Sequence, residues 1–144
     1  DFIVAFTVFI LLMLYYQFTP NFLGFFFLPF ALCITLMFAA GIGAILAALN
    51  VYYRDIRFII PFALQVLLFL TPVVYPANLI SEKYRLILQL NPMAAIIESV
   101  QGVLLGTSTV NVGFLGISVF VSIVSFFIGL GYFMNSEKYF ADIV

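Results

Sequence analysis

The residues best suited to binding chemistry lie close together between positions 50 and 57. Arg54 and Arg57 flank Asp55, and Asn50 and Tyr53 come just before them. The guanidinium group of arginine is planar and can donate two parallel hydrogen bonds to a carboxylate or a phosphate. These charges could pair with one another, contact a partner protein or bind a lipid pyrophosphate. The alternative is that they only anchor a loop at a membrane surface.

Two prolines mark a second candidate region. Pro72 and Pro76 enclose the end of an apolar stretch, and Tyr75 lies between them. Proline has no N–H group to donate within a helix, so a helix bends or stops there. The pattern favours either a hinge that serves a gate or an ordinary helix end.

A short helix is predicted at positions 92–105. Asn91 is a good N-cap residue, Pro92 suits the first helical turn, and Gly106 suits the position after the helix. A helix of this length rises only ~21 Å, too little for the ~30 Å hydrocarbon layer of a membrane. The segment must therefore dip into the membrane or lie flat on it.

The same helix has two unlike sides. Glu98 and Gln101 lie three positions apart and so fall on one side. The other side carries Ile96, Ile97, Val100, Val103 and Leu104. Such a pattern is typical of a re-entrant or interfacial amphipathic helix. With a shorter helix beginning near Ser81, the segment 81–106 is predicted to form an external helix pair.

Residue types that usually carry catalysis are missing. The sequence has no histidine and one cysteine, Cys33. It also lacks a glycine-rich loop ending in Lys and Ser or Thr, which would hold nucleotide phosphates. We therefore expect no catalytic residue, no metal site and no cofactor in this chain, so that any ATP must bind another polypeptide. The uncharged apolar stretches argue against a proton- or sodium-coupled carrier, because such carriers usually rest on intramembrane carboxylates.

The elements that position these residues follow from an extreme composition. Hydrophobic residues make up 66% of the 144 positions, charged residues make up 8%, and the mean hydropathy is +1.28. A soluble domain carries about a quarter of its residues as Asp, Glu, Lys or Arg. Lipid must therefore cover much of this chain. The formal net charge of -1 offers no basic surface for nucleic acid.

Four uncharged apolar stretches reach the length of a membrane-spanning helix, roughly 17–20 residues. They cover positions 2–18, 28–49, 58–75 and 112–134. The charged residues lie at the ends and breaks, as expected when a charge at mid-bilayer costs on the order of 3 kcal/mol. Positions 1–144 are therefore predicted to form one all-α transmembrane domain. It is a polytopic helix bundle with four spans and the short external helix pair between the last two.

Four spans place both chain ends on the side that carries Arg54 and Arg57. A lysine near the C-terminus joins them there, whereas Lys83 and Arg85 fall on the other side. The positive-inside rule then makes the first side cytoplasmic. The chain begins with Asp1, directly in an apolar run, and we therefore expect it to be part of a longer protein.

Four motifs around these spans resemble one known family. They are Asn-Val-Tyr-Tyr-Arg-Asp-Ile-Arg at 50–57, Thr-Pro-Val-Val-Tyr-Pro at 71–76, Leu-Asn-Pro-Met at 90–93, and Tyr-Phe-Met-Asn-Ser-Glu-Lys-Tyr-Phe-Ala-Asp at 132–142. In this order, the chain resembles the C-terminal part of type-2 ABC exporter permeases for O-antigen and teichoic-acid polysaccharides. The resemblance covers nearly the whole chain.

The resemblance implies the last four spans of a six-span permease that works as a homodimer in the bacterial cytoplasmic (inner) membrane. It implies two copies of a separate ABC ATPase, which binds ATP and Mg on the cytoplasmic side, and a lipid-linked polysaccharide as substrate. The family's external gate helices correspond to the segment 81–106. An exporter of a drug or lipid, an ion-coupled carrier or channel, and a membrane protein with a structural role are the alternatives.

Three tyrosines lie at span ends near the expected external face: Tyr15, Tyr16 and Tyr75. Aromatic faces can stack on sugar rings, so these tyrosines are candidates for the glycan path under the same resemblance. The alternative is the aromatic belt that many membrane proteins carry at the lipid headgroups.

A run of small residues lies in the second predicted span: Ala39, Ala40, Gly41, Gly43, Ala44, Ala47 and Ala48. Small residues spaced four apart let helix backbones approach closely. Packing within one subunit is the simpler use of this run, and a dimer seam is the alternative.

Overall fold

The computed structural model describes residues 2–18, 21–71, 91–106 and 111–143, and within them every regular element is an α-helix. The helices are α1 (Phe2–Tyr15), α2 (Phe22–Tyr52), α3 (Ile56–Leu70), α5 (Pro92–Leu105) and α6 (Val112–Ile143). The predicted all-α class is confirmed for this part of the chain.

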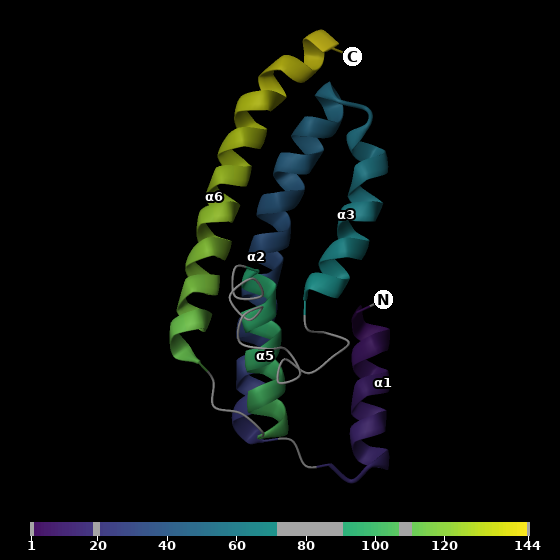
Figure 1. The fold of residues 1–144 in the computed structure, drawn as a ribbon, viewed down its shortest axis with the longest axis vertical. Helices are drawn as coiled ribbons and strands as arrows, with labels where there is room; N and C mark the ends of the chain where they lie inside the picture. Colours follow the sequence, from purple (N-terminus) through teal and green to yellow (C-terminus); the bar gives the residue numbers. More distant parts are fainter. Residues whose placement is uncertain (1, 19–20, 72–90, 107–110, 144) are drawn as a thin grey trace.

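The helices α2 and α6 are long and run side by side in the same direction (Figure 1). Their 31 and 32 residues extend over ~46–48 Å. The stretches Gly24–Tyr52 and Val112–Lys138 are long and apolar enough to cross a membrane. Helix α2 begins six positions before the predicted span and continues through Pro29, since membrane helices tolerate an internal proline.

Small residues let α2 and α6 approach closely. A Cβ atom added at Gly41 would lie 2.5 Å from the carbonyl oxygen of Ser125, and one added at Gly129 would collide with the backbone of Gly41. Ser118 and Ser122 are buried on α6 and donate their hydroxyl hydrogens to carbonyl oxygens one turn earlier. Packing within one chain is thus a use of the small-residue run at Gly41.

The helix α1 is shorter than the span predicted at 2–18. It has 14 residues, or ~21 Å of helix, against a hydrocarbon layer of ~30 Å. It ends because Gln17 adopts a left-handed φ of 52°, which lets the Phe18 N–H donate to the Met13 carbonyl oxygen at 3.0 Å. This is the Schellman geometry, in which the left-handed residue is usually glycine, so a glutamine at position 17 does not predict it.

The helix α3 also falls short of its predicted span at 58–75. It begins at Ile56, ends at Leu70 after 15 residues, and thus extends over ~22 Å. Positions 72–75 lie outside the described residues. The four-span arrangement therefore stays a prediction, with α2 and α6 as the helices long enough to cross.

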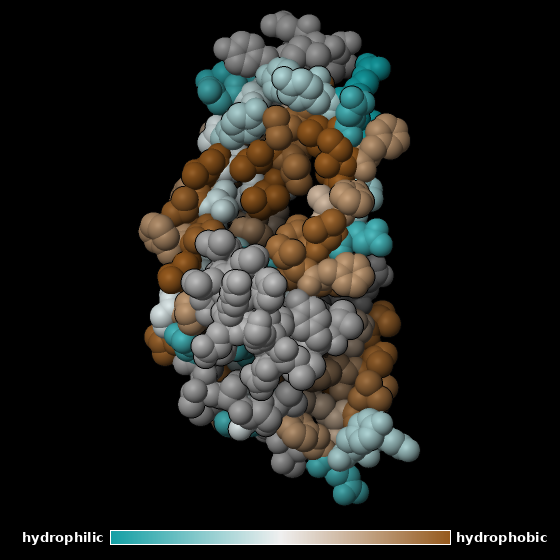
Figure 2. Space-filling model, viewed as in Figure 1, coloured by the Kyte–Doolittle hydropathy of each residue, from teal (hydrophilic) through white to brown (hydrophobic). Residues whose placement is uncertain are grey.

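The shorter helices each cover half of the long axis (Figure 1). Helix α3 occupies the upper half beside α2, α1 occupies the lower half, and α5 lies against the lower half of α2. The start of α1, the end of α3 and the start of α5 thus lie at similar heights near the middle. Apolar residues cover much of the visible surface of α2, α3 and α6, and hydrophilic residues gather at the upper end (Figure 2).

Candidate functional site

The start of α5 is fixed by Asn91, as predicted. The Asn91 side-chain oxygen accepts a hydrogen bond from the Met93 N–H at 3.1 Å, and Pro92 occupies the first turn. Gly106 follows the helix with a left-handed φ of 63°. The bounds of this helix are therefore confirmed by the cap geometry at both ends.

Helix α5 is buried on more sides than its sequence pattern predicted. Ile96 is 3% exposed and packs in a core with Ala31 and Ile34 of α2. Further buried residues of α5 are Ala94, Ala95, Ser99 and Leu104. Glu98 and Gln101, expected on the polar side, are half-buried. The reason is that α5 packs against both α2 and α6, where the small side chains fit.

A buried hydrogen bond joins the end of α3 to the start of α5. The Asn91 Nδ2 atom donates to the Thr71 hydroxyl at 2.9 Å, although the two residues are 20 positions apart. Thr71 is 7% exposed and Asn91 is 9% exposed. The junction therefore lies inside the helix assembly, near the middle of its long axis (Figure 1).

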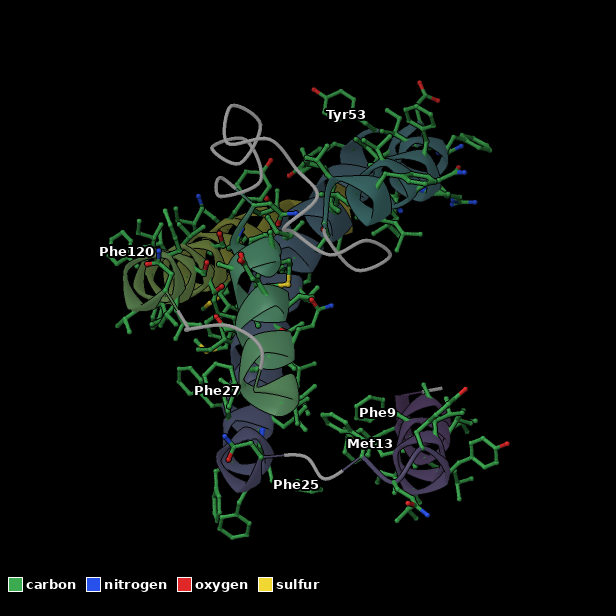
Figure 3. All side chains as sticks on the ribbon, turned by 60° about the horizontal axis from the view of Figure 1, so that its bottom comes forward. Phe9, Met13, Phe25, Phe27, Tyr53 and Phe120 are labelled. Carbon is green, nitrogen blue, oxygen red and sulfur yellow. The ribbon has the colours of Figure 1, made fainter. Side chains whose placement is uncertain are left out.

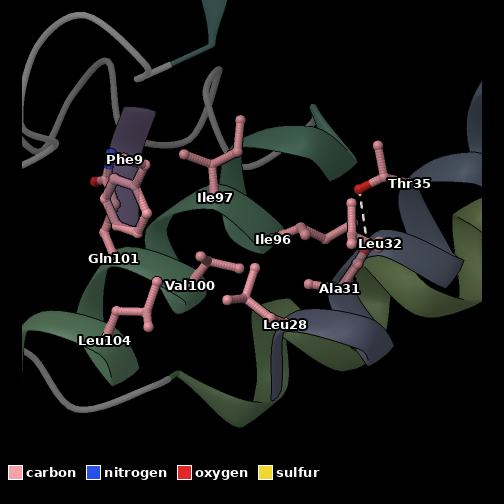
Figure 4. A pocket seen from close by; sticks show the side chains of 10 residues that line it. All are labelled: Phe9, Leu28, Ala31, Leu32, Thr35, Ile96, Ile97, Val100, Gln101 and Leu104. Atoms are coloured by element: carbon pink, nitrogen blue, oxygen red, sulfur yellow. Dashed lines mark hydrogen bonds between the residues drawn. The ribbon is translucent and has the colours of Figure 1, made fainter. Parts of the chain in front are cut away.

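An apolar groove of about 470 Å³ separates α1 from α2 and α5, and we call it the α1 groove. Its lining is shown in Figure 4: Phe9, Leu28, Ala31, Leu32, Thr35, Ile96, Ile97, Val100, Gln101 and Leu104. Thr35 uses its hydroxyl to donate to the Ala31 carbonyl oxygen at 2.8 Å. Gln101 is therefore the lining residue with an amide available to a ligand.

A smaller space of about 220 Å³ continues along the same side of α1. Phe9 and Met13 extend from α1 toward the rest of the molecule, and Phe25 extends from α2 toward α1 (Figure 3). Phe9 and Leu28 line both spaces. Helix α1 is thus separated from α2 and α5 by adjoining apolar spaces lined mainly by aliphatic and aromatic side chains.

A second groove of about 470 Å³ lies among α2, α3 and α5, and we call it the α3 groove. Its walls include Gly43 and Leu46 of α2 and Leu67 of α3. Thr71 and Asn91 also line it and supply its polar side chains. The buried hydrogen bond between the two helices therefore borders an apolar space.

The charged candidates lie at the upper end of the molecule, in the turn between α2 and α3 and in the first turn of α3, and we call positions 53–57 the α2–α3 turn (Figure 1). Tyr53, Arg54, Asp55 and Arg57 are all exposed. Asn50 lies one turn earlier, inside α2, and its buried side-chain oxygen has no partner among the described residues. The turn thus presents two arginines and a carboxylate on one short surface.

The tyrosines at the end of α1 lie at the opposite, lower end. Tyr15 and Tyr16 are 80% and 74% exposed, and their rings meet edge to face with centroids 5.3 Å apart. Tyr75, Pro72 and Pro76 lie outside the described residues. The structure thus brings together two of the three predicted tyrosines.

Thr71 is the residue that sequence reasoning missed. Thr71 begins the Thr-Pro-Val-Val-Tyr-Pro motif, in which the two prolines and Tyr75 were the predicted site residues. A threonine at the end of an apolar helix can reach a distant partner, but one sequence does not indicate which. The buried serines of α6 were also missed, because their burial depends on how α6 packs against its neighbours.

Comparison with known proteins identifies a family. The model of the family described as "ABC-2 type transporter" matches residues 2–105, which is more than half of the chain. An O-antigen export system permease protein RfbA of Klebsiella pneumoniae is 25% identical over 143 residues, which is 99% of this chain and 55% of that protein. The RfbA permease of Myxococcus xanthus is 38% identical over 77 residues, which is 52% of this chain and 30% of that protein. The chain thus spans about half of the first relative's length.

Proposed function

The chain belongs to the ABC-2 type transporter family, and on that premise we propose that it is part of a permease for a lipid-linked polysaccharide. It is an integral membrane protein. The proposed cargo is an O-antigen, a teichoic acid or a capsule-type glycan, moved across the bacterial inner membrane by ATP-driven export.

The main support for the proposed substrate is the extent of the similarity to an export permease. The similarity to an O-antigen export permease extends over 99% of this chain, so it includes all the described helices and the turn after α2. A similarity restricted to one apolar helix would reflect composition alone. The order of the four motifs around these helices supports the same substrate class.

We propose that α2 and α6 cross the membrane, that α1 and α3 lie within the other two predicted spans, at 2–18 and 58–75, and that α5 enters the membrane from the external face. In this arrangement the turn with Arg54, Asp55 and Arg57 faces the cytoplasm together with the C-terminal end of α6 (Figure 1). The exposed arginines suit an ATPase subunit or a lipid phosphate, because their forks match carboxylate and phosphate oxygens.

We further propose a homodimer with two copies of a separate ATPase, which holds the ATP and Mg. The apolar lining of the α1 groove suits the lipid part of the cargo, and the exposed rings of Tyr15 and Tyr16 suit its sugars. Since the chain spans about half of the first relative, we expect transport from the full-length permease and not from residues 1–144 alone.

The experiment deletes the gene for the full-length permease in its own bacterium and measures surface polysaccharide by immunoblot. The proposal predicts that surface glycan is lost and that lipid-linked glycan accumulates inside the cell. Restoring the permease should restore export only when an active ATPase is present and co-purifies with it.

Two results would contradict this function. Normal surface glycan after deletion, with loss of efflux of another amphiphile, would identify a drug or lipid exporter. Transport that continues without ATP and collapses with the ion gradient would identify a coupled carrier or channel.

A further inference from the structure

The hydrogen bond between Thr71 and Asn91 connects α3 and α5, two helices that differ in how many of their residues are buried. Helix α5 contributes Ile96 to the core with Ala31 and Ile34 of α2. Helix α3 has no buried residue along its length. The buried contact that holds the inner end of α3 is therefore Thr71, directly after its last residue.

Both partners are further tied to the backbone of their own helices. The Thr71 hydroxyl donates to the Leu67 carbonyl oxygen at 2.8 Å, and the Thr71 N–H donates to the same oxygen at 2.9 Å. The Asn91 Oδ1 atom accepts from the Met93 N–H at 3.1 Å. A continuous series of hydrogen bonds thus links the last turn of α3 to the first turn of α5.

Because the hydrogen bond between Thr71 and Asn91 is buried, the junction of α3 and α5 has two distinct states, one with this bond formed and one with it open. Away from water, an opened donor and acceptor lose their partner without replacement, so the bond is either made or exchanged for another partner. The α3 groove borders this bond, and Thr71 and Asn91 supply its polar side chains. Opening the bond would free both side chains to face that groove.

We propose that the hydrogen bond between Thr71 and Asn91 is a latch that closes the junction of α3 and α5, and that transport opens it. The proposal rests on the exporter function above, because α3 begins at the turn with Arg54 and Arg57, where the ATPase is expected to act. A displacement of that turn passes along α3 to Thr71. Asn91 caps α5, which packs against α2 and α6, so Asn91 stays in place when Thr71 moves.

Cross-linking tests the latch directly. The experiment uses membranes that contain the full-length permease and its ATPase. Cys33→Ala removes the thiol of this chain, and any cysteine outside residues 1–144 is also replaced by Ala. In a variant with both Thr71→Cys and Asn91→Cys, the two thiols are joined by a short bis-methanethiosulfonate, which forms reducible disulfides. One sample contains no nucleotide, and the other contains ATP trapped by vanadate. We expect efficient cross-linking at rest, a several-fold lower yield in the trapped state, and a cross-linked complex whose ATP hydrolysis recovers on reduction.

Equal yields in the two states, or no cross-link at rest, would overturn the latch. Failure of the exporter function is distinguishable, because the ATPase would then not co-purify while the cross-link at rest would still form.

A matched set of threonine variants gives a second measurement. Thr71→Val keeps the shape and removes the hydroxyl, Thr71→Ser keeps the hydroxyl, and Thr7→Val removes an exposed hydroxyl that bonds to its own helix on α1. Losing one such bond should raise ATP hydrolysis without cargo by about two- to tenfold in Thr71→Val. Thr71→Ser and Thr7→Val should match the wild type. Equal rates in Thr71→Val and Thr7→Val would contradict the proposal.

Discussion

Gly129 of α6 lies where two helix backbones nearly touch. A Cβ atom there would collide with the backbone of Gly41, whereas one at Gly131, two positions later, would meet nothing within 4 Å. The two glycines therefore differ in packing while sharing the same helix. Glycine at such a crossing is used for the space it leaves and not for its flexibility.

Gly129→Ala is expected to destabilise the protein by about 1–3 kcal/mol, because the methyl group forces α2 and α6 apart. Gly131→Ala is the control and should leave stability unchanged or slightly higher. Thermal unfolding of the purified full-length permease in detergent measures the difference. Equal midpoints for the two variants would show that this crossing does not determine how α2 packs on α6.

The arginines of the α2–α3 turn give the second residue-scale prediction. Replacing Arg54 and Arg57 together by Gln should lower the amount of ATPase that co-purifies by about fivefold, since exposed ion pairs contribute up to ~1 kcal/mol each. Replacing both by Lys should restore part of it, because Lys keeps the charge without the planar fork. Lys138→Gln, another exposed cation on the same proposed side, is the control. Unchanged co-purification in the double Gln variant would indicate that these arginines do not bind the ATPase and only anchor the loop at the membrane surface.

At the scale of elements, the sequence predicted helices best where it carried explicit end signals. Helix α5 was located to the residue because Asn91, Pro92 and Gly106 act through local geometry that one sequence displays. The end of α1 was missed because Gln17 adopts a left-handed conformation that its type does not announce. Boundaries drawn from hydropathy alone were off by several residues, as at the start of α2.

The candidate site was predictable only in part, for a related reason. Asn91 and the exposed arginines were recognised from their types and neighbours. The partner of Asn91 is 20 positions away, and that pairing depends on how α3 and α5 are packed. The two grooves likewise arise from the spacing between helices, which no local pattern encodes.

The α1 groove provides a prediction at this scale. Leu32 lines the groove, and Leu36, one turn later on α2, is 67% exposed and lies outside it. Leu32→Trp should narrow the groove and lower polysaccharide export on the order of tenfold, which corresponds to ~1.4 kcal/mol. Leu36→Trp should export normally at equal protein level. Equal export by both variants, measured by surface immunoblot, would show that the groove does not carry cargo.

At the scale of the whole molecule, the two long and three half-length helices of the described residues pack unequally. Helices α2 and α6 share a close crossing, while α3 has no buried residue and α1 is separated from α2 and α5 by adjoining grooves. A polytopic membrane protein tolerates such open faces because lipid or another subunit covers them. The turn after α2 and the end of α1 then lie at opposite ends, as the proposed topology requires (Figure 1).

The most direct test of the proposed topology asks which side of the membrane the end of α1 and the turn after α2 each face. In a full-length protein in which Cys33 and any cysteine outside residues 1–144 are replaced by Ala, Tyr16→Cys and Tyr53→Cys are labelled one at a time with a membrane-impermeant thiol reagent. Both tyrosines are well exposed, at 74% and 64%. We expect position 16 to react in intact cells and position 53 to react only after the membrane is opened. Reaction of both positions from the same side would contradict the topology, and with it the proposed exporter.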